Sequence, residues 1–216
     1  MLIKSFSHYL KFVEHRRGHA FAVLGYPRSG TTMLSELVAM TTSYYFDRNN
    51  MFPATGRMVL HTHWDPRKFN PELSLYIVRN PVSVAASVLN FYHVNGWAKP
   101  SGNPLADPKI CRMDWSEHVT SAMARGIPLV DYDRLMVRDT ATVAALAEHL
   151  SARPHWIESA LTLLSEMHQH APHQTDAKFH RAGPLATPEG DGDRERLQSV
   201  LKDEIDLYQR AFGTTG

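Results

Sequence analysis

The stretch AFAVLGYPRSGTT, residues 20–32, indicates both the fold class and a ligand site. Its first six residues are an apolar run that ends in Gly25, and such a run predicts a short buried strand. Its end leads into residues 32–40, where apolar side chains have the spacing of a helix. Gly25 and Gly30 have the spacing of the phosphate-binding signature GxxxxGK(S/T), and Thr32 stands at its final hydroxyl position. A strand, a glycine loop and a helix in this order predict a phosphate-binding loop.

The chemistry of this loop suits an anion but departs from that of magnesium-dependent ATPases. Glycines let the backbone wrap around a phosphate, and the N-terminus of the following helix presents unpaired N–H groups. The lysine position of the signature holds Thr31, and a cation appears three residues earlier, as Arg28. Such ATPases normally also have an acidic residue at the end of a neighbouring strand, but the next apolar run is followed by Arg79. We therefore predict an anion pocket that contains no metal.

A second anion site is predicted after the strand-like run at residues 73–78. Arg79 follows this run, an Asn-Pro pair makes a turn, and helical spacing then covers residues 82–91. Ser87 is eight residues beyond Arg79, so the start of the helix can bring a guanidinium and a hydroxyl to one ligand. This pair suits a terminal phosphate, because arginine is a forked, charge-assisted donor. Two anion sites at two strand ends suit a nucleotide phosphorylated at both its 3′ and its 5′ position.

The remaining segments predict a single α/β domain over residues 1–216. Strand-like runs alternate with helical patterns, which is typical of a parallel sheet with helices on both faces. The strand-like runs are residues 20–25, 57–61, 73–78 and 127–131, and the helical patterns are residues 32–40, 82–91, 115–125, 139–150, 154–168 and 194–212. Two segments, 95–108 and 170–193, are expected to be loops, because the first is rich in Gly, Pro and Asn and the second is polar.

Composition and charge exclude several classes of protein. The 216 residues include 23 lysines and arginines and 22 acidic residues, and a net charge of +1 argues against a protein that coats nucleic acid. Cys111 is the only cysteine, which rules out a disulfide framework. No apolar stretch reaches the length of a membrane span, and the N-terminus lacks a signal-peptide core, so we expect a soluble, cytoplasmic protein. The first 18 residues predict an amphipathic helix that either covers the core or lies on a membrane surface.

The loop YPRSGTTM, residues 26–33, resembles the PxSGTT loop of the sulfotransferases that use 3′-phosphoadenosine 5′-phosphosulfate (PAPS). The resemblance implies a three-layer P-loop-type fold. It also implies that the loop residues that bind the 5′-phosphosulfate are Ser29, Gly30, Thr31 and Thr32. In that family the basic residue of the loop, here Arg28, contacts the bridging oxygen as it becomes a leaving group. Most cytosolic members have lysine there and tryptophan where this chain has Met33, which is expected to cover the purine face.

The segment YIVRNPVSVAAS, residues 76–87, resembles the second PAPS-binding segment of the same family. By this resemblance Arg79 and Ser87 hold the 3′-phosphate. A weaker match places Tyr132 either near the adenine or in the core. Another looks like a C-terminal R-x-G element that helps to bind the 3′-phosphate, with the residues Arg181 and Gly183.

His61 and His63 lie at the end of the predicted strand 57–61 and admit two interpretations. With Asp65 they match a pattern of metal-dependent hydrolases, because alternate strand residues point to one face. By the resemblance, His63 matches the catalytic histidine of the family's K-(S/T)-H segment, and His61 replaces its lysine. The family's histidine takes the proton from the acceptor hydroxyl, a role that requires a neutral imidazole. The resemblance thus implies that His63, His61 and Arg28 are catalytic.

These inferences favour a PAPS-dependent sulfotransferase that needs no metal. It would transfer a sulfuryl group to a hydroxyl or an amine of a small-molecule acceptor and release 3′-phosphoadenosine 5′-phosphate (PAP). The alternatives are a kinase or nucleotide hydrolase on the same scaffold, a metal-dependent hydrolase built on the two histidines and Asp65, and a non-catalytic nucleotide-binding module. The chain is short for the family before His61, so we expect a shallow acceptor pocket or one completed by the loop 95–114 and Trp97. The acceptor and the oligomeric state stay open, a homodimer included.

Overall fold

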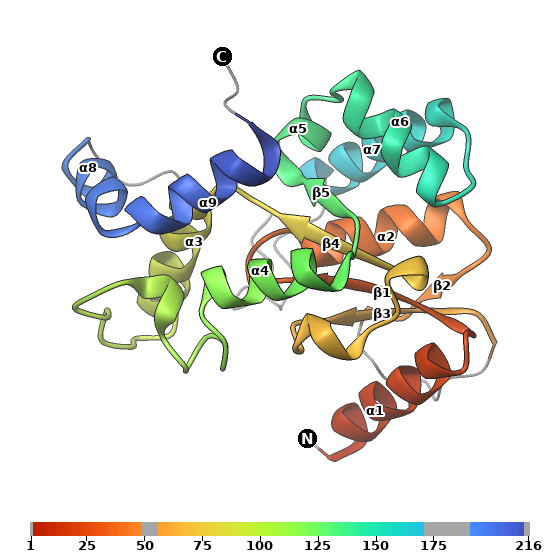
Figure 1. Cartoon of the computed structure of the whole chain (residues 1–216), viewed down its shortest axis with the longest axis horizontal. Helices are drawn as coiled ribbons and strands as arrows, with labels where there is room; N and C mark the ends of the chain where they lie inside the picture. The colour runs from red at the N-terminus through yellow and green to blue at the C-terminus, as the bar shows by residue number, and fades with distance from the viewer. Residues whose placement is uncertain (1, 49–55, 171–190, 214–216) are drawn as a thin grey trace.

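A computed structural model of the chain describes residues 2–48, 56–170 and 191–213. Within these residues, five parallel strands form one sheet in the order β2-β3-β1-β4-β5 (Figure 1). The strands are β1 (Ala20–Gly25), β2 (Tyr45–Phe46), β3 (Met58–Thr62), β4 (Ser74–Val78) and β5 (Leu129–Asp131). The predicted α/β fold with a parallel sheet is therefore confirmed.

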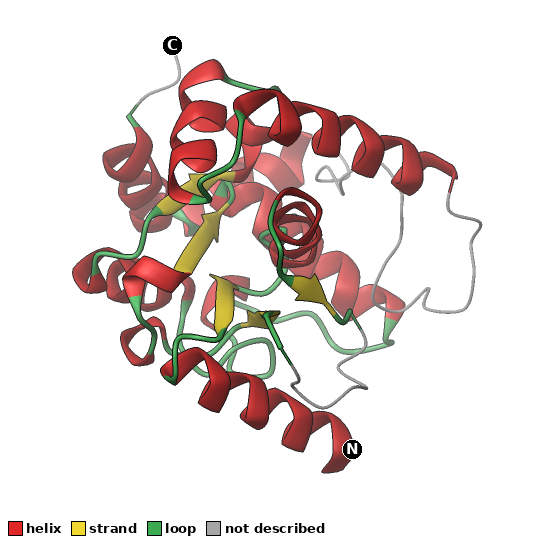
Figure 2. Cartoon of the chain, turned by 90° about the vertical axis from the view of Figure 1, so that its right-hand side faces the viewer, coloured by secondary structure: helices red, strands yellow, loops and turns green. Residues whose placement is uncertain are grey.

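Helices precede, connect and follow these strands and lie on both sides of the sheet (Figures 1 and 2). They are α1 (Leu2–Arg16), α2 (Thr31–Thr41), α3 (Pro81–Val94), α4 (Trp115–Arg125), α5 (Tyr132–Met136), α6 (Thr140–His149), α7 (Pro154–His170), α8 (Asp191–Val200) and α9 (Lys202–Phe212), with the short 3-10 helices η1 (Pro66–Lys68), η2 (Pro71–Leu73) and η3 (Pro104–Ala106). Side-chain caps fix several starts. Asn80 accepts the N–H of Val82 at the start of α3, and Asp114 accepts that of Glu117 at the start of α4.

Alternate residues of the central strand β1 point to opposite faces of the sheet, and each face has its own buried cluster. Ala22 and Leu24 belong to one cluster, which buries residues of α3, α4, α8 and α9 and is covered by Phe12 of α1. Phe21 and Val23 belong to the other, which buries residues of α2, α5, α6 and α7. The sheet is thus the middle of three layers, as the sequence predicted.

The strand order determines where a ligand can bind. β1 and β2 are joined through α2 on one side of the sheet, and the connection from β3 to β4 passes from one side of β1 to the other. In open α/β sheets, ligands bind outside the carboxyl ends of the strands at such a reversal of winding. The pairing of Leu24 with Thr62 and of Gly25 with Ile77 brings the carboxyl ends of β1, β3 and β4 to this edge.

Two details differ from the sequence prediction. β2 has only two residues, which is too few for a periodic pattern to be recognised. The single helix predicted over 194–212 is divided at Leu201, whose φ of −104° and ψ of 25° lie outside the α-helical region. Leu201 is buried in the same cluster as Leu197 of α8 and Leu207 of α9, so the break lets two short helices cover one core.

The predicted N-terminal amphipathic helix packs on the core. On α1, the ring of His15 donates to the backbone oxygen of Ala20 (2.9 Å) and accepts the N–H of Asn70 (3.0 Å). One turn earlier, Lys11 is fully buried and forms an ion pair of 3.3 Å with buried Asp47, which follows β2. These contacts hold α1 against the β2–β3 side of the sheet. Within the described ranges, no helix is both long and apolar enough to cross a membrane.

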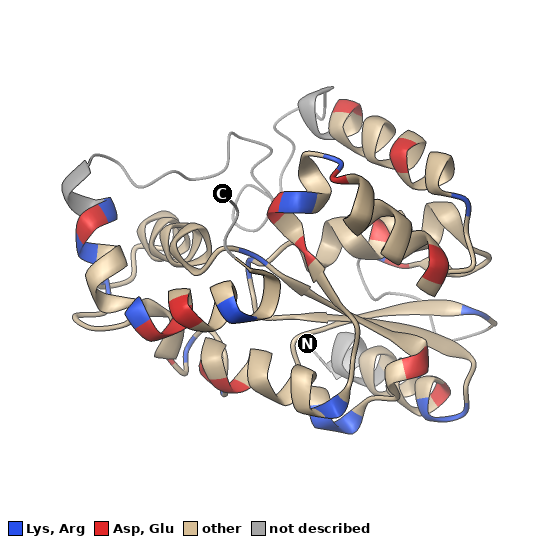
Figure 3. Ribbon diagram, turned by 45° about the horizontal axis from the view of Figure 1, so that its top comes forward, with Lys and Arg blue, Asp and Glu red and all other residues tan. Residues whose placement is uncertain are grey.

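Basic and acidic residues are interspersed along the helices in the view of Figure 3. This distribution agrees with the near-neutral net charge of +1. The cations considered below are therefore distinguished by their burial and position.

The buried ion pair generates a prediction about stability. Lys11→Met leaves the Asp47 carboxylate buried without its cation, and we expect the free energy of unfolding to fall by about 3 kcal/mol, measured by urea denaturation. The double variant Lys11→Met/Asp47→Leu should recover much of this loss, because it removes both charges. An equal loss in the two variants would mean that packing, and not an uncompensated charge, is responsible.

Candidate functional site

The loop between β1 and α2 has the backbone of an anion-binding site. Arg28 and Gly30 both have positive φ angles, 74° and 100°. Such left-handed residues turn successive backbone N–H groups into a concavity that binds anions. Gly30 caps α2 and provides no side-chain hydrogen bond, so the first N–H groups of the helix are available to a ligand. Within the described residues, the fully buried Ser29 hydroxyl also has no hydrogen-bond partner. A buried polar atom without a partner is costly, and an anion in the concavity would relieve this cost.

Both glycines of the loop are required by close approaches of neighbouring elements. A Cβ atom at Gly25 would lie 2.7 Å from a methyl of Thr31 and 2.9 Å from the backbone oxygen of Ile77. A Cβ atom at Gly30 would lie 2.5 Å from the ring of Tyr132. The loop is therefore packed tightly between β4 and the start of α5.

The two predicted anion sites meet in the structure. Nε of Arg28 donates to the hydroxyl of Ser87 on α3 at 3.0 Å, and an Nη of Arg79 donates to the backbone oxygen of Arg28 at 3.4 Å. The Arg79 side chain is buried, its Nε has no partner among the described residues, and its guanidinium lies 4.9 Å from the centre of the Tyr132 ring. Burial lowers the pKa of Arg28, and the charge of Arg79 lowers it further. Two half-buried or buried cations so close together favour an anionic ligand.

His61 contacts the start of α2, and His63 contacts the end of β1, on either side of the loop that joins these two elements. Nε2 of His61 lies 2.9 Å from the hydroxyl of Thr31, and Nδ1 of His63 donates to the backbone oxygen of Gly25 at 2.7 Å. Because Nδ1 of His63 carries the proton, Nε2 of the neutral ring is the atom that can accept one. Burial, with smaller contributions from His118 and Arg28, lowers the pKa of His63 to about 4, although the bond to Gly25 opposes this shift. The His63 ring is therefore neutral over the physiological pH range.

The alternative metal site does not form in the described part of the chain. Asp65 forms an ion pair of 2.9 Å with Arg67 and caps η1, and the two histidines make the contacts given above. Among the residues that the structure describes, no three His, Cys, Asp or Glu side chains come together in an arrangement that could hold a metal ion.

The other predicted site residues have varied positions. Thr32 is half-buried in the first turn of α2, and Met33 is buried in the core cluster that covers α2, so its contact with a purine stays a prediction. Tyr132 is buried between Gly30 and Arg79, as described above. Arg181 and Gly183 lie outside the described residues.

Three residues near His63 were missed by the sequence analysis. The ring of His8 on α1 lies 3.1 Å from the hydroxyl of Thr62 and packs edge-on against Trp64, with centroids 4.7 Å apart. The buried ring of His118 on α4 donates to the backbone oxygen of His63 at 3.1 Å, and the hydroxyl of Tyr76 lies 2.8 Å from the other nitrogen of this ring. No spacing in the sequence connects these positions, because only the packing of α1 and α4 on the sheet brings them to the end of β3.

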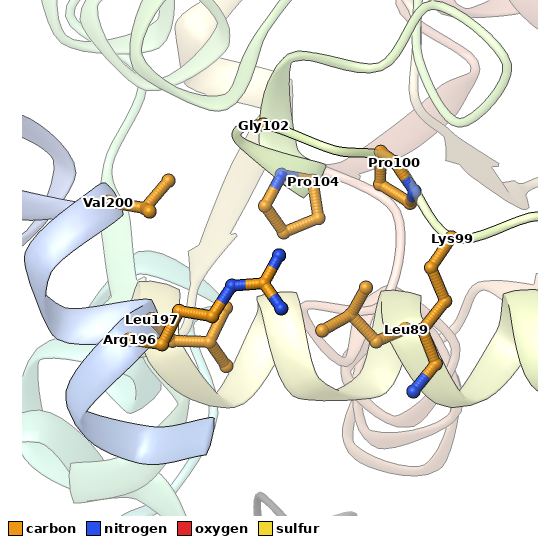
Figure 4. Close-up of a pocket in the computed structure, with 8 residues that line it drawn as sticks. All are labelled: Leu89, Lys99, Pro100, Gly102, Pro104, Arg196, Leu197 and Val200. Atoms are coloured by element: carbon orange, nitrogen blue, oxygen red, sulfur yellow. The ribbon is translucent and has the colours of Figure 1, made fainter. Parts of the chain in front are cut away.

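A separate pocket of about 50 Å³ lies between α3, the loop before η3, and α8. Its lining residues, drawn in Figure 4, are Leu89, Lys99, Pro100, Gly102, Pro104, Arg196, Leu197 and Val200. The guanidinium of Arg196 lies between Pro104 and Leu89 in this view. Leu89 is two residues from Ser87 on α3 and therefore faces another direction. The pocket contains none of the predicted site residues.

Comparison with solved structures identifies proteins with the same fold. Mouse sulfotransferase SULT7A1, in a crystal structure with PAP, has a TM-score of 0.65 and 12% identity, with 96% of this chain and 95% of that chain covered. Retinol dehydratase, in complex with androsterone and the inactive cofactor PAP, has a TM-score of 0.52 and 15% identity, with 89% and 80% covered. Scans of the sequence against protein-family models and curated proteins find no match. The chain therefore has a sulfotransferase fold, in agreement with the family resemblance of its motifs.

The contact between Gly30 and Tyr132 can be tested by stability. Gly30→Ala places a side chain both at a positive φ and against the Tyr132 ring, whereas Gly96→Ala has a positive φ of 66° and open space around its Cβ. We expect Gly96→Ala to lower the free energy of unfolding by about 1 kcal/mol and Gly30→Ala to lower it by about 2 kcal/mol more, measured by thermal and urea denaturation. Equal effects would mean that Tyr132 moves aside at little cost.

Proposed function

We propose that this chain transfers a sulfuryl group from PAPS to a hydroxyl or an amine of a small-molecule acceptor and releases PAP. The observation that carries the proposal is the 3.0 Å hydrogen bond between Arg28 and Ser87, because it joins two motifs that indicate two separate anion sites. The fold supports the same reaction class, since both similar structures contain PAP. The androsterone bound to retinol dehydratase supports a small organic molecule as the acceptor.

The residues present fit a nucleotide phosphorylated at both ends. The concave backbone at residues 28–32 and the unpartnered hydroxyl of Ser29 would hold the 5′ end. Arg79, whose Nε is buried without a partner, and Ser87 would hold the 3′-phosphate. The first group lies on the loop between β1 and α2 and the second on the β4–α3 segment, and the bond from Arg28 to Ser87 places the two groups side by side. The roles of Arg181, Gly183 and Met33 in the same site stay predictions from the family resemblance.

The chain would contribute three functions to the transfer. Nε2 of His63 would accept the proton of the acceptor hydroxyl. The bond from Nδ1–H to Gly25 keeps the proton of the neutral ring on Nδ1, so Nε2 stays unprotonated. Arg28 would stabilise the negative charge that develops on the leaving bridging oxygen. His61, bonded to Thr31, would hold the first turn of α2. When bound, PAPS would supply the sulfuryl group, and the electron pair of its broken S–O bond would leave with PAP.

Binding and turnover together test the proposal. Thermal shift and calorimetry should detect PAP binding more strongly than ATP binding, because ATP lacks the 3′-phosphate. Incubation with PAPS and a panel of phenols, alcohols, amines and sugars should yield PAP and a sulfated product. ATP turnover with added magnesium would favour a kinase or hydrolase. Stoichiometric zinc with hydrolysis would favour the metal-dependent alternative, and PAP binding with no transfer to any acceptor would favour a binding module.

Arg79 provides a sharper test of the 3′-phosphate site. Arg79→Met should weaken PAP binding by about 10- to 100-fold, because it removes one or two charge-assisted hydrogen bonds. It should weaken ATP binding much less, because ATP lacks the 3′-phosphate. The control is Arg125→Met, because Nε of Arg125 also donates to a backbone oxygen, that of Phe69, away from the site. Equal losses for PAP and ATP would contradict the assignment.

The role of His63 predicts a pH dependence. The active form is the neutral ring and its pKa is about 4, so kcat/KM should be nearly level between about pH 6 and 8 and should fall as the pH approaches 4. His63→Ala should lower kcat by about 10²- to 10⁴-fold and leave the Kd of PAP nearly unchanged. A midpoint near 6.5, or turnover that survives the substitution, would remove His63 as the base.

A further inference from the structure

A closed ring of hydrogen bonds connects His63 to the start of the phosphate-binding loop. Nδ1 of His63 donates to the backbone oxygen of Gly25, and the backbone oxygen of His63 accepts Nε2–H of His118. Nδ1 of His118 and the hydroxyl of Tyr76 lie 2.8 Å apart, and the Tyr76 hydroxyl also has a hydrogen bond with the backbone of Tyr26. Since Gly25 and Tyr26 are adjacent, the ring closes on the loop itself.

The chemistry of this ring determines the position of each proton. A carbonyl oxygen only accepts, so His118 must donate from Nε2 to His63. In a neutral imidazole the other nitrogen then accepts, so Tyr76 donates its O–H to Nδ1 of His118. The opposite tautomer of His118 would turn a lone pair toward the carbonyl of His63. The carbonyl of His63 therefore fixes the tautomer of His118, and the Tyr76 hydroxyl donates to the nitrogen that this tautomer leaves unprotonated.

Burial makes this arrangement stable. Tyr76 and His118 are both fully buried. Burial raises the pKa of Tyr76 and lowers the pKa of His118, so both side chains stay neutral. The thiol of Cys111 also points to this carbonyl of His63, at 3.9 Å. This contact is longer and weaker than the hydrogen bond from His118, because sulfur is a weak donor.

We propose that His118 and Tyr76 are positioning residues, which fix the backbone of His63 so that its Nε2 faces the acceptor. The inference rests on the proposed function, because it assigns the ring to the transfer step. His63 is held at two points, its ring nitrogen and its carbonyl, and loss of the second leaves its backbone free to shift. A misplacement of about 1 Å can cost about 100-fold in rate, while ligand binding by other residues is preserved.

Three variants test the ring, and a fourth controls for stability. Tyr76→Phe removes the hydroxyl that donates to Nδ1 of His118, and His118→Leu removes the donor to His63. His118→Gln retains an amide donor at about the position of Nε2. His149→Leu is the control, because Nε2 of His149 donates to the backbone oxygen of Ser74 at 3.1 Å at the opposite end of β4.

The kinetic result separates positioning from general stability. We expect kcat with PAPS and the best acceptor to fall about tenfold in Tyr76→Phe and about 100-fold in His118→Leu. His118→Gln should recover most of this loss, and the Kd of PAP should change less than about twofold in all three. His149→Leu should reduce the melting temperature but leave kcat unchanged. Wild-type kcat in Tyr76→Phe and His118→Leu, or an equal loss in His149→Leu, would overturn the inference.

Imidazole nitrogen chemical shifts, measured by NMR at neutral pH, give a readout that does not depend on turnover. In the wild type, His118 should carry its proton on Nε2 and His63 on Nδ1. Tyr76→Phe should leave the proton of His118 on Nε2 and shift the Nδ1 resonance of His118, because that nitrogen loses its hydrogen bond. An unchanged Nδ1 resonance in this variant would overturn the role of Tyr76. A wild-type protein that binds no PAP and transfers no sulfuryl group would contradict the proposed function instead, so the two failures are distinguishable.

Discussion

The parallel pairing of β1 with β3 and β4 is the constraint on which the site depends. It places Gly25, Thr62 and Ile77 at one edge of the sheet, so the loop after β1, the histidines after β3 and the arginine after β4 emerge side by side. None of these segments forms the site alone. The ladder of backbone hydrogen bonds supplies their common position, and the two core clusters hold it rigid from either face of the sheet.

At this edge, positive charge is concentrated without any broad basic surface. Arg79 stacks on Tyr132 and donates to the backbone oxygen of Arg28. The side chain of Arg28 in turn donates to Ser87. The net charge of the chain is only +1, so attraction of an anion is local and comes from desolvated groups. The proposed specificity for a doubly phosphorylated ligand would depend on these two arginines.

The fold and the residues of the candidate site were accessible from the sequence because their signals are local. The apolar run 20–25, the glycine spacing and the residues after the run 73–78 lie within short windows, and each window corresponds to one strand–loop–helix unit. The ring through Tyr76 and His118 was not accessible, because His63, Tyr76 and His118 are separated by 13 to 55 residues and no periodicity relates them. The break at Leu201 was missed for a related reason: it carries neither Gly nor Pro and is determined by burial against the core. Local chemistry predicted the residues of the candidate site, whereas tertiary packing determined which residues hold His63.

The close packing of Gly30 against Tyr132 has a consequence for the catalytic cycle. Because this packing already fixes the loop between β1 and α2, the loop needs little reorganisation when a ligand binds, and affinity is not reduced by the cost of ordering it. PAPS and PAP have the same two phosphate groups, and a preorganised loop would bind the two nucleotides with almost equal affinity. Uniform affinity of this kind does not accelerate chemistry. Turnover would then be governed by departure of the nucleotide, and PAP would accumulate as an inhibitor of the enzyme that made it.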